Sequence, residues 1–296
     1  MEQQQPTSHF YSSRGLRLHY CEWGDSKLPP LLLIHGMQDH CRTWDGLTEC
    51  LAGQYRFIAP DLRGHGDSEW SRGSTYHPLD YVYDLVVLIR ELKLKQLTLV
   101  GHSLGGTVAV ILAAVCRAET KQLVSIEGIG LLPDGEDSRT TEDSRTTEEQ
   151  LQGWIEGLDL LATKRPRRYR DVAAAVGRMR ELHTGLSADQ AHHLCLHGLR
   201  QNDDESFSWK YDNGTLVWPA FGLSSQQQIA LWRGVTCPAL FINAAQGYDY
   251  RTGQNGTLDH FASAEEVVVE DAGHWTYHDQ LGDVVEQISQ FVQIVR

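Results

Sequence analysis

The chain has 296 residues, of which 41% are hydrophobic, and its formal net charge at pH 7 is −13. This length allows one large α/β domain with an insertion, or two small domains, and the composition allows a substantial buried core. The negative charge argues against nucleic acids and anionic membrane surfaces as partners.

The beginning of the chain and its cysteines bear on location. The first ten residues, "MEQQQPTSHF", are polar and carry no apolar signal segment. No apolar run approaches the roughly 18 residues that a membrane helix needs. The six cysteines are scattered without a C-x-x-C pair, at Cys21, Cys41, Cys50, Cys116, Cys195 and Cys237. We therefore expect free thiols and a cytoplasmic protein with no membrane span.

Short apolar runs predict strands that alternate with helices along the chain. The predicted strands cover residues 16–24, 29–36, 55–61, 96–103, 121–128, 238–244 and 264–274. The predicted helices between them cover residues 78–93, 104–118 and 281–295. The middle strands are nearly continuous in Leu, Val and Ile, as expected for parallel strands buried on both faces. The alternation predicts an α/β fold with a mostly parallel central sheet and helices on both faces.

The alternation breaks between about residues 131 and 233. Helical patterns at 148–161, 169–183 and 187–200 precede a segment at 207–218 that is expected to be extended around a turn. We interpret 131–233 as a helical cap inserted into a core made of 1–130 and 234–296. The tandem repeat "EDSRTT-EDSRTT" at 136–147 has no apolar face, so we expect an exposed loop and assign it no function.

A serine lies where a predicted strand passes into a predicted helix. Gly101-x-Ser103-x-Gly105 matches the nucleophile elbow, a sharp turn that exposes a serine hydroxyl while its flanking glycines avoid clashes. The backbone N–H of Leu104 would then face a developing oxyanion. A second donor is expected after an earlier strand, where Gly36 allows close approach and the Met37 N–H is our candidate. The alternative is a serine that only caps a buried helix.

Together these segments resemble the α/β-hydrolase superfamily. The matching pieces are His35-Gly36, "DLRGHGDS" at 61–68, "GHSLGG" at 101–106 and "DAGHW" at 271–275, in the family's order. The resemblance implies that Ser103 is the nucleophile and that His274, after the last strand, is the general base. It covers most of the chain outside the cap and says little about the substrate.

The resemblance leaves the acid of the catalytic triad ambiguous. Most members carry it after the strand that reads "ALFINA" here, but Gly247 occupies that position and Asp249 lies two residues further on. The end of the preceding core strand, "LVSIEG", offers Glu127, and this placement resembles the haloalkane dehalogenase branch. The loop "AAQGYDYR" also resembles the serine-hydrolase-like group. We favour Glu127 over Asp249, and the two residues remain alternatives at this point.

Histidines in the cap raise the question of a metal. His193 and His197 have the i,i+4 spacing of a zinc pair, but no H-E-x-x-H glutamate and no obvious third ligand accompany them. We therefore expect no metal and no organic cofactor.

The predicted function is a serine carboxylesterase that acts on small or medium acyl esters through an acyl-enzyme. One alternative is a cofactor-free dioxygenase of the same fold, which would use His274 and Glu127 without Ser103 as nucleophile. Another is a non-catalytic ligand-binding protein of this fold. The predicted partner is a small-molecule ester; the sequence names neither its acyl nor its alcohol group, and it gives no oligomeric state.

Overall fold

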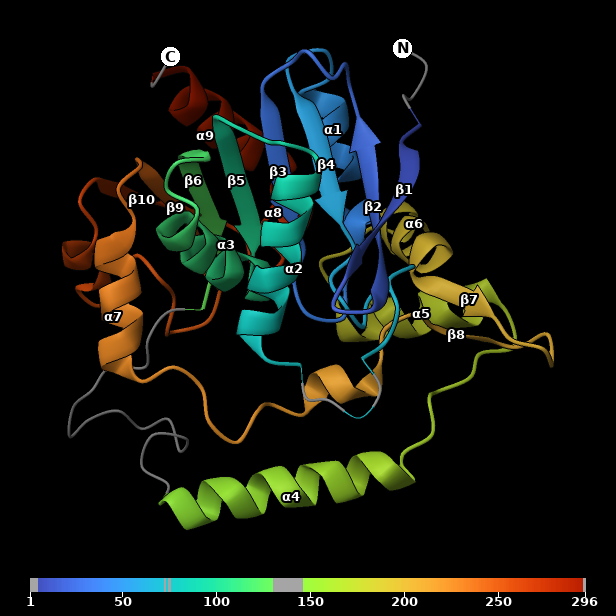
Figure 1. The fold of residues 1–296 in the computed structure, drawn as a ribbon. Helices are drawn as coiled ribbons and strands as arrows, with labels where there is room; N and C mark the ends of the chain where they lie inside the picture. The colour runs from blue at the N-terminus through green and yellow to red at the C-terminus, as the bar shows by residue number, and fades with distance from the viewer. Residues whose placement is uncertain (1–4, 72, 74–75, 130–145, 295–296) are drawn as a thin grey trace.

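A central sheet of eight strands organises the protein (Figure 1). The computed structural model describes residues 5–71, 73, 76–129 and 146–294. The strand order is β1-β2-β4-β3-β5-β6-β9-β10; β1 pairs antiparallel with β2, β2 pairs antiparallel with β4, and the other neighbours are parallel. The strands are β1 (Thr7–Ser13), β2 (Leu16–Trp23), β3 (Pro30–Ile34), β4 (Arg56–Pro60), β5 (Leu97–His102), β6 (Thr120–Ile126), β9 (Ala239–Ala244) and β10 (Ala264–Val269). The predicted mostly parallel sheet is confirmed.

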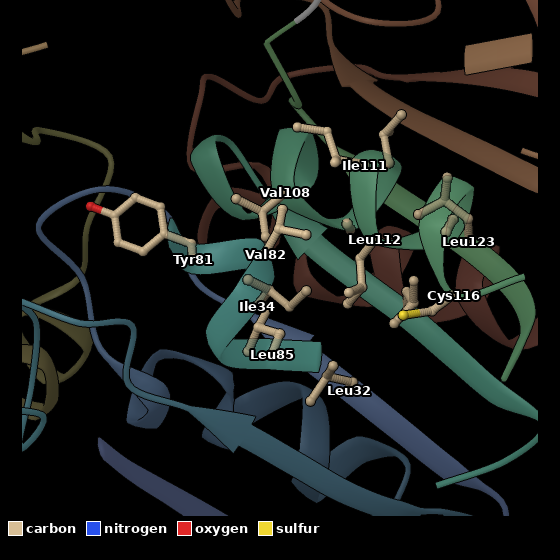
Figure 2. Close-up of a cluster of buried hydrophobic side chains, with 14 of the residues drawn as sticks. Leu32, Ile34, Tyr81, Val82, Leu85, Val108, Ile111, Leu112, Cys116 and Leu123 are labelled. Carbon is tan, nitrogen blue, oxygen red and sulfur yellow. The ribbon is translucent and has the colours of Figure 1, made fainter. Parts of the chain in front are cut away.

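Helices cover both faces of this sheet, as predicted. They are α1 (Asp45–Cys50), α2 (Pro78–Glu91), α3 (Leu104–Val115), α7 (Ser225–Gly234), α8 (Thr276–Asp279) and α9 (Leu281–Ile294). One buried cluster joins the sheet to α2, α3 and α7, and a second joins its other face to α1 and α9. Figure 2 shows the first cluster, to which β3 contributes Ile34, α2 contributes Leu85 and α3 contributes Val108. Because β5 is buried along its whole length, its apolar run packs on both faces.

The elements between β6 and β9 are mainly helical. They are α4 (Thr147–Thr163), α5 (Val172–Leu182), α6 (Ala188–Gly198), β7 (Leu199–Gln201), β8 (Phe207–Trp209) and the 3₁₀ helix η2 (Asn213–Leu216), followed by α7. Helix α4 has no buried residue and lies apart from the sheet (Figure 1). Apart from Thr146 and Thr147, the tandem repeat at 136–147 lies outside the described residues.

The segment 207–218 is expected from the sequence to be extended around a turn at residues 212–214; the turn is present, but the part after it is not a strand. Only β8 is extended, and it pairs antiparallel with β7. The Asp212 carboxylate accepts a hydrogen bond from the Gly214 N–H at 3.0 Å, and the Asp212 carbonyl accepts one from the Thr215 hydroxyl at 2.7 Å. These local bonds turn the chain into η2, because an aspartate that satisfies nearby donors competes with strand pairing.

The sequence reasoning also missed β1, α1 and α7. Strand β1 reads "TSHFYSS" and is largely exposed, so it lacks the apolar run that marks the other strands. Helix α7 packs against the core through Trp232, which belongs to the same buried cluster as α3. Within the residues that the structure describes, no helix combines the length and apolarity needed to cross a bilayer.

Candidate active site

Ser103 occupies a strained turn between β5 and α3. Its φ is 53° and its ψ is −119°, a conformation that costs a non-glycine residue energy. The turn brings its neighbours into close contact, since a Cβ on Gly101 would clash with the carbonyl of Gly105, and a Cβ on Gly105 would clash with the carbonyl of Ile34. The glycines of the motif are therefore needed for backbone packing, and the turn presents the serine side chain at the carboxyl end of β5.

Ser103, His274 and Glu127 form one hydrogen-bonded chain. The Ser103 Oγ lies 2.9 Å from the His274 Nε2, and the His274 Nδ1 lies 3.2 Å from the Glu127 Oε2. When Nδ1–H donates to the carboxylate, Nε2 is free to accept the serine proton. Ser103 is 7% exposed and Glu127 is fully buried. The loop after β10 thus brings a histidine to the edge of the sheet where β5 and β6 end.

The buried Glu127 carboxylate has a partner that the sequence analysis missed. Its Oε1 accepts hydrogen bonds from the Ala244 N–H and from the Arg251 Nη1, each at 2.6 Å. The Arg251 guanidinium also donates to the Ala244 carbonyl. A buried carboxylate is stable only when it is paired and hydrogen-bonded, so Arg251 offsets the cost of burying Glu127. The one available signal was the arginine in "AAQGYDYR", downstream of a candidate buried acid.

The two candidate acids have different surroundings. Asp249 lies in the exposed part of the loop after β9, where its backbone carbonyl accepts a hydrogen bond from the Asn255 side chain at 3.2 Å. Gly247, at the family's usual acid position, lies directly against the Glu127 carboxylate, and a Cβ there would clash with both oxygens. The space of an acid after β9 is therefore filled by the glutamate from β6. Of the two, the structure brings Glu127 to His274.

Glu127 itself has a positive φ of 49°, so a second strained residue ends a neighbouring strand. Its N–H donates to the Ile242 carbonyl at 2.8 Å, and the Thr252 N–H donates to the Gly128 carbonyl at 2.9 Å. These bonds join the end of β6 to β9 and to the loop that carries Arg251. The carboxylate is thus fixed by backbone on both sides.

Of the two predicted oxyanion donors, Leu104 follows Ser103 directly, and Met37 follows Gly36, which packs against Ser103. Leu104 is the first residue of α3, where an N–H has no acceptor within the helix. Met37 is half-buried in the turn after β3. Its N–H makes none of the backbone hydrogen bonds that the described residues form outside the helices and strands. A Cβ on Gly36 would come within 3.3 Å of the Ser103 Cβ, so the glycine permits this approach. Their role as donors to an oxyanion stays a prediction.

His102 supports the loop that carries His274. Its Nε2 donates to the His274 carbonyl at 2.7 Å, and the two rings are 4.9 Å apart. Complete burial, followed by the nearby His274, lowers the pKa of His102 well below its usual value. The ring is therefore neutral and donates through Nε2. This role of the second residue in "GHSLGG" was not part of the sequence prediction.

His193 and His197 are half-buried and contact the segment before α1. The His193 Nε2 donates to the Arg42 carbonyl at 3.0 Å, and the same nitrogen lies 3.3 Å from the Asp45 carboxylate. His197 lies 3.4 Å from the Arg42 guanidinium. Together they anchor α6 to the segment that precedes and begins α1.

A cavity of about 470 Å³ is lined in part by His274. Its wall includes the loop 183–186 of the cap, Tyr248 and Trp275. The Tyr248 ring lies 4.4 Å from the His274 ring, and the His183 ring stacks on Trp275 at 4.3 Å. Aromatic rings from the cap and the core therefore meet next to the candidate base.

Comparison with known proteins places the chain in a family. The sequence model of the family described as "alpha/beta hydrolase fold" matches residues 29–281. The chain therefore belongs to the α/β hydrolase family, as its motifs indicated. A thioesterase domain from the curacin biosynthetic pathway has the same fold, with a TM-score of 0.83 at 23% identity over 96% of this chain and 99% of that one.

Curated relatives with similar sequences match part of the chain. A serine hydrolase-like protein of Danio rerio is 28% identical over 182 residues, which are 61% of this chain and 54% of that protein. An uncharacterised protein of Mycobacterium bovis is 36% identical over 129 residues, which are 44% of this chain and 37% of that protein. The matches thus span about a third to a half of the relatives' lengths.

Proposed function

We propose that this protein is a serine carboxylesterase with Ser103 as nucleophile, His274 as general base and Glu127 as the acid of the triad. The observation that carries the proposal is the hydrogen-bonded chain from the Ser103 Oγ to the His274 Nε2, at 2.9 Å, and from the His274 Nδ1 to the Glu127 Oε2, at 3.2 Å. The proposed substrates are small or medium acyl esters.

The proposed reaction follows from this geometry. His274 takes the Ser103 proton through Nε2 while the oxygen attacks the ester carbonyl, and Glu127 stabilises the imidazolium through Nδ1–H. The N–H groups of Met37 and Leu104 stabilise the oxyanion. His274 then gives its proton to the departing alcohol, which leaves an acyl group on Ser103. Water, activated by the same histidine, releases the acid and restores the serine.

The strained backbone of Ser103 distinguishes this proposal from the alternatives. A serine that only caps a helix has no need of a positive φ, and a dioxygenase that uses only His274 and Glu127 has no need of a serine hydroxyl at 2.9 Å from the base. The strain has a functional reason if the turn presents a nucleophile. A non-catalytic role is disfavoured because the chain has a candidate for every member of the triad.

Three further parts of the sequence prediction stay proposals. The first is the division into a core of 1–130 and 234–296 and a cap of 131–233, with α7 at the cap's end packed on core helix α3. The second is the cytoplasmic location, which the six free cysteines support. The likeness of the Glu127 placement to the haloalkane dehalogenase branch also stays a prediction.

The proposal is tested by covalent labelling and turnover together. We expect a fluorophosphonate probe to label the wild type and p-nitrophenyl esters of increasing acyl length to show a preferred short or medium chain. Ser103→Ala should not be labelled, and its kcat should be lower by a factor of about 10⁴ to 10⁶, while its circular dichroism spectrum stays unchanged. Near-normal turnover by Ser103→Ala would show that another group is the nucleophile. A wild type that neither reacts with the probe nor hydrolyses any ester would overturn the esterase assignment.

A further inference from the structure

A buried cluster of nitrogen and sulfur ligands lies apart from the candidate active site. Strand β2 carries His19 and Cys21, which are two residues apart and so point to the same face of the strand. Cys41, the first residue of the 3₁₀ helix η1 (Cys41–Trp44), meets them from the segment after β3. All three are nearly inaccessible, with exposed fractions of 3%, 4% and 2%. We propose that His19, Cys21 and Cys41 bind a thiophilic divalent cation, with Zn²⁺ as the representative ion.

The spacing of the three ligands fits such an ion. One ring nitrogen of His19 and the two Sγ atoms all lie within 4.8 Å of one another. Three points with that separation lie within 4.8 Å divided by √3, about 2.8 Å, of a common centre. Zinc binds thiolate sulfur at about 2.3 Å and imidazole nitrogen at about 2.0 to 2.1 Å. Each ligand therefore has to move by less than about 1 Å to reach a bonding distance.

The surroundings of His19 are those of a metal-binding histidine. Its Nδ1 lies 2.7 Å from the Asp61 Oδ2, and the other oxygen of Asp61 accepts a hydrogen bond from the Cys41 N–H at 2.7 Å. A carboxylate that accepts one ring N–H fixes the orientation of the imidazole and leaves the other nitrogen for a metal. That nitrogen, Nε2, lies 4.0 Å from the Cys21 sulfur and 2.8 Å from the hydroxyl of the exposed Ser8, which the cation would displace. The Cys41 sulfur lies 4.0 Å from Nδ1, so it has to turn towards Nε2 when the cation binds.

The ligand types select the class of cation. Thiolates and imidazole favour zinc and similar soft or borderline ions, whereas magnesium and calcium prefer oxygen ligands. A cavity of about 140 Å³ is lined by His19, Cys21, Cys41 and Asp61, among other residues, so an ion can enter and water can fill a fourth position. The two thiolates balance the charge of the ion. A bound cation would join β2 to the segment that carries the Met37 N–H.

A second group of possible ligands serves as an internal comparison. Asp45, His193 and His197 also offer three atoms within 4.8 Å of one another. The Arg42 guanidinium donates to both oxygens of Asp45, with its Nη2 at 2.6 Å from Oδ2. A fixed positive charge at the carboxylate repels a second cation. We therefore expect the ion at the cluster on β2 and not at this one.

The experiment measures Zn²⁺ binding by the full chain, reduced with a phosphine and then equilibrated by dialysis against the ion. The variants are Cys21→Ser and Cys41→Ser, with Cys50→Ser as a control at an exposed thiol and His193→Gln as a control at the rival cluster. We expect one bound equivalent in the wild type and in both controls. Each cluster variant should lose at least about tenfold in affinity.

Two readouts keep the proposal testable if a cysteine variant does not fold. Co²⁺ added to the wild type should give a thiolate-to-cobalt charge-transfer band. Asp61→Asn, which keeps the shape of a group that is not itself a ligand, should weaken Zn²⁺ binding by about ten- to a hundredfold. The proposal is overturned if the reduced wild type binds no Zn²⁺, if Cys21→Ser and Cys41→Ser both bind like the wild type, or if binding depends on His193 instead.

Discussion

Replacing Glu127 with glutamine keeps the shape of the side chain and reverses a hydrogen bond at the candidate base. In the wild type, Oε1 accepts from the Ala244 N–H and from Arg251, each at 2.6 Å, while Oε2 faces the His274 Nδ1 at 3.2 Å. Two donors converge on one position, so the oxygen of the new amide must occupy it. The amide NH₂ then takes the place of Oε2 and donates to Nδ1. The His274 proton moves to Nε2, which can no longer accept a proton from Ser103.

The expected loss of activity follows from this change of tautomer. The same exchange of carboxylate for amide in another serine triad leaves the geometry intact and lowers kcat by about 10⁴. We expect Glu127→Gln to lose about 10³ to 10⁴ in kcat, which corresponds to about 4 to 5.5 kcal/mol of barrier. Asp249→Asn should lose less than about tenfold, because its exposed side chain stabilises no imidazolium.

Both variants should be measured with one p-nitrophenyl ester in one assay, with circular dichroism to confirm folding. Fluorophosphonate labelling adds an independent readout, since Glu127→Gln should also react slowly with the probe. If Asp249→Asn is inactive and Glu127→Gln keeps most of its activity, the acid comes from the loop after β9 and the reasoning from the Oε1 contacts fails.

Three further predictions concern the surroundings of the site and the core. Arg251→Met leaves the buried Glu127 without its cation, so the free energy of unfolding in urea should fall by about 3 to 5 kcal/mol; an unchanged value would contradict the account of the buried pair. Gly247→Ala places a methyl group against the Glu127 carboxylate, so kcat should fall by more than about tenfold, whereas Gly222→Ala, where a Cβ meets nothing within 4 Å, should leave kcat unchanged. Burial lowers the pKa of His65 to about 4. Below about pH 6.5, His65 is therefore protonated in the unfolded chain but stays neutral in the folded protein. The free energy of unfolding should therefore fall by about 1.4 kcal/mol per pH unit as the pH is lowered from about 6.5 to 4. Urea unfolding of His65→Gln at several pH values should show a correspondingly weaker dependence of this free energy on pH.

The parts of the fold that the sequence predicts are those with strong apolar patterns. Strand β5 and helix α3 are buried almost throughout, so both are made of apolar residues that the sequence reveals as a strand followed by a helix. Helix α7, "SQQQIALWRG", was missed because its packing depends mainly on Trp232. The turn at residues 212–214 was predicted from its residue types, but the 3₁₀ helix that continues it was not, because it depends on hydrogen bonds of Asp212 that no periodicity reveals.

The residues of the candidate site also differ in whether the sequence predicts them. Ser103 and His274 are recognisable because each lies in a short motif, and the glycines beside Ser103 are required by the local backbone. The choice between Glu127 and Asp249 could not be settled from spacing, because it depends on which loop folds back to the histidine. Arg251 was missed because its ion pair joins residues that are far apart in the chain, and a buried pair of this kind leaves no local pattern.

The contact between Gly247 and the Glu127 carboxylate has a consequence for how such a chain could evolve. The two positions exclude each other: a side chain at 247 cannot coexist with a glutamate at 127 in this arrangement. A lineage that moved its acid from one strand to the other would pass through a protein with either two clashing acids or none. If Glu127 is the acid, either intermediate is expected to be impaired, which favours a joint change of the two residues. We therefore expect relatives with a side chain at the position of Gly247 to lack a glutamate at the position of Glu127.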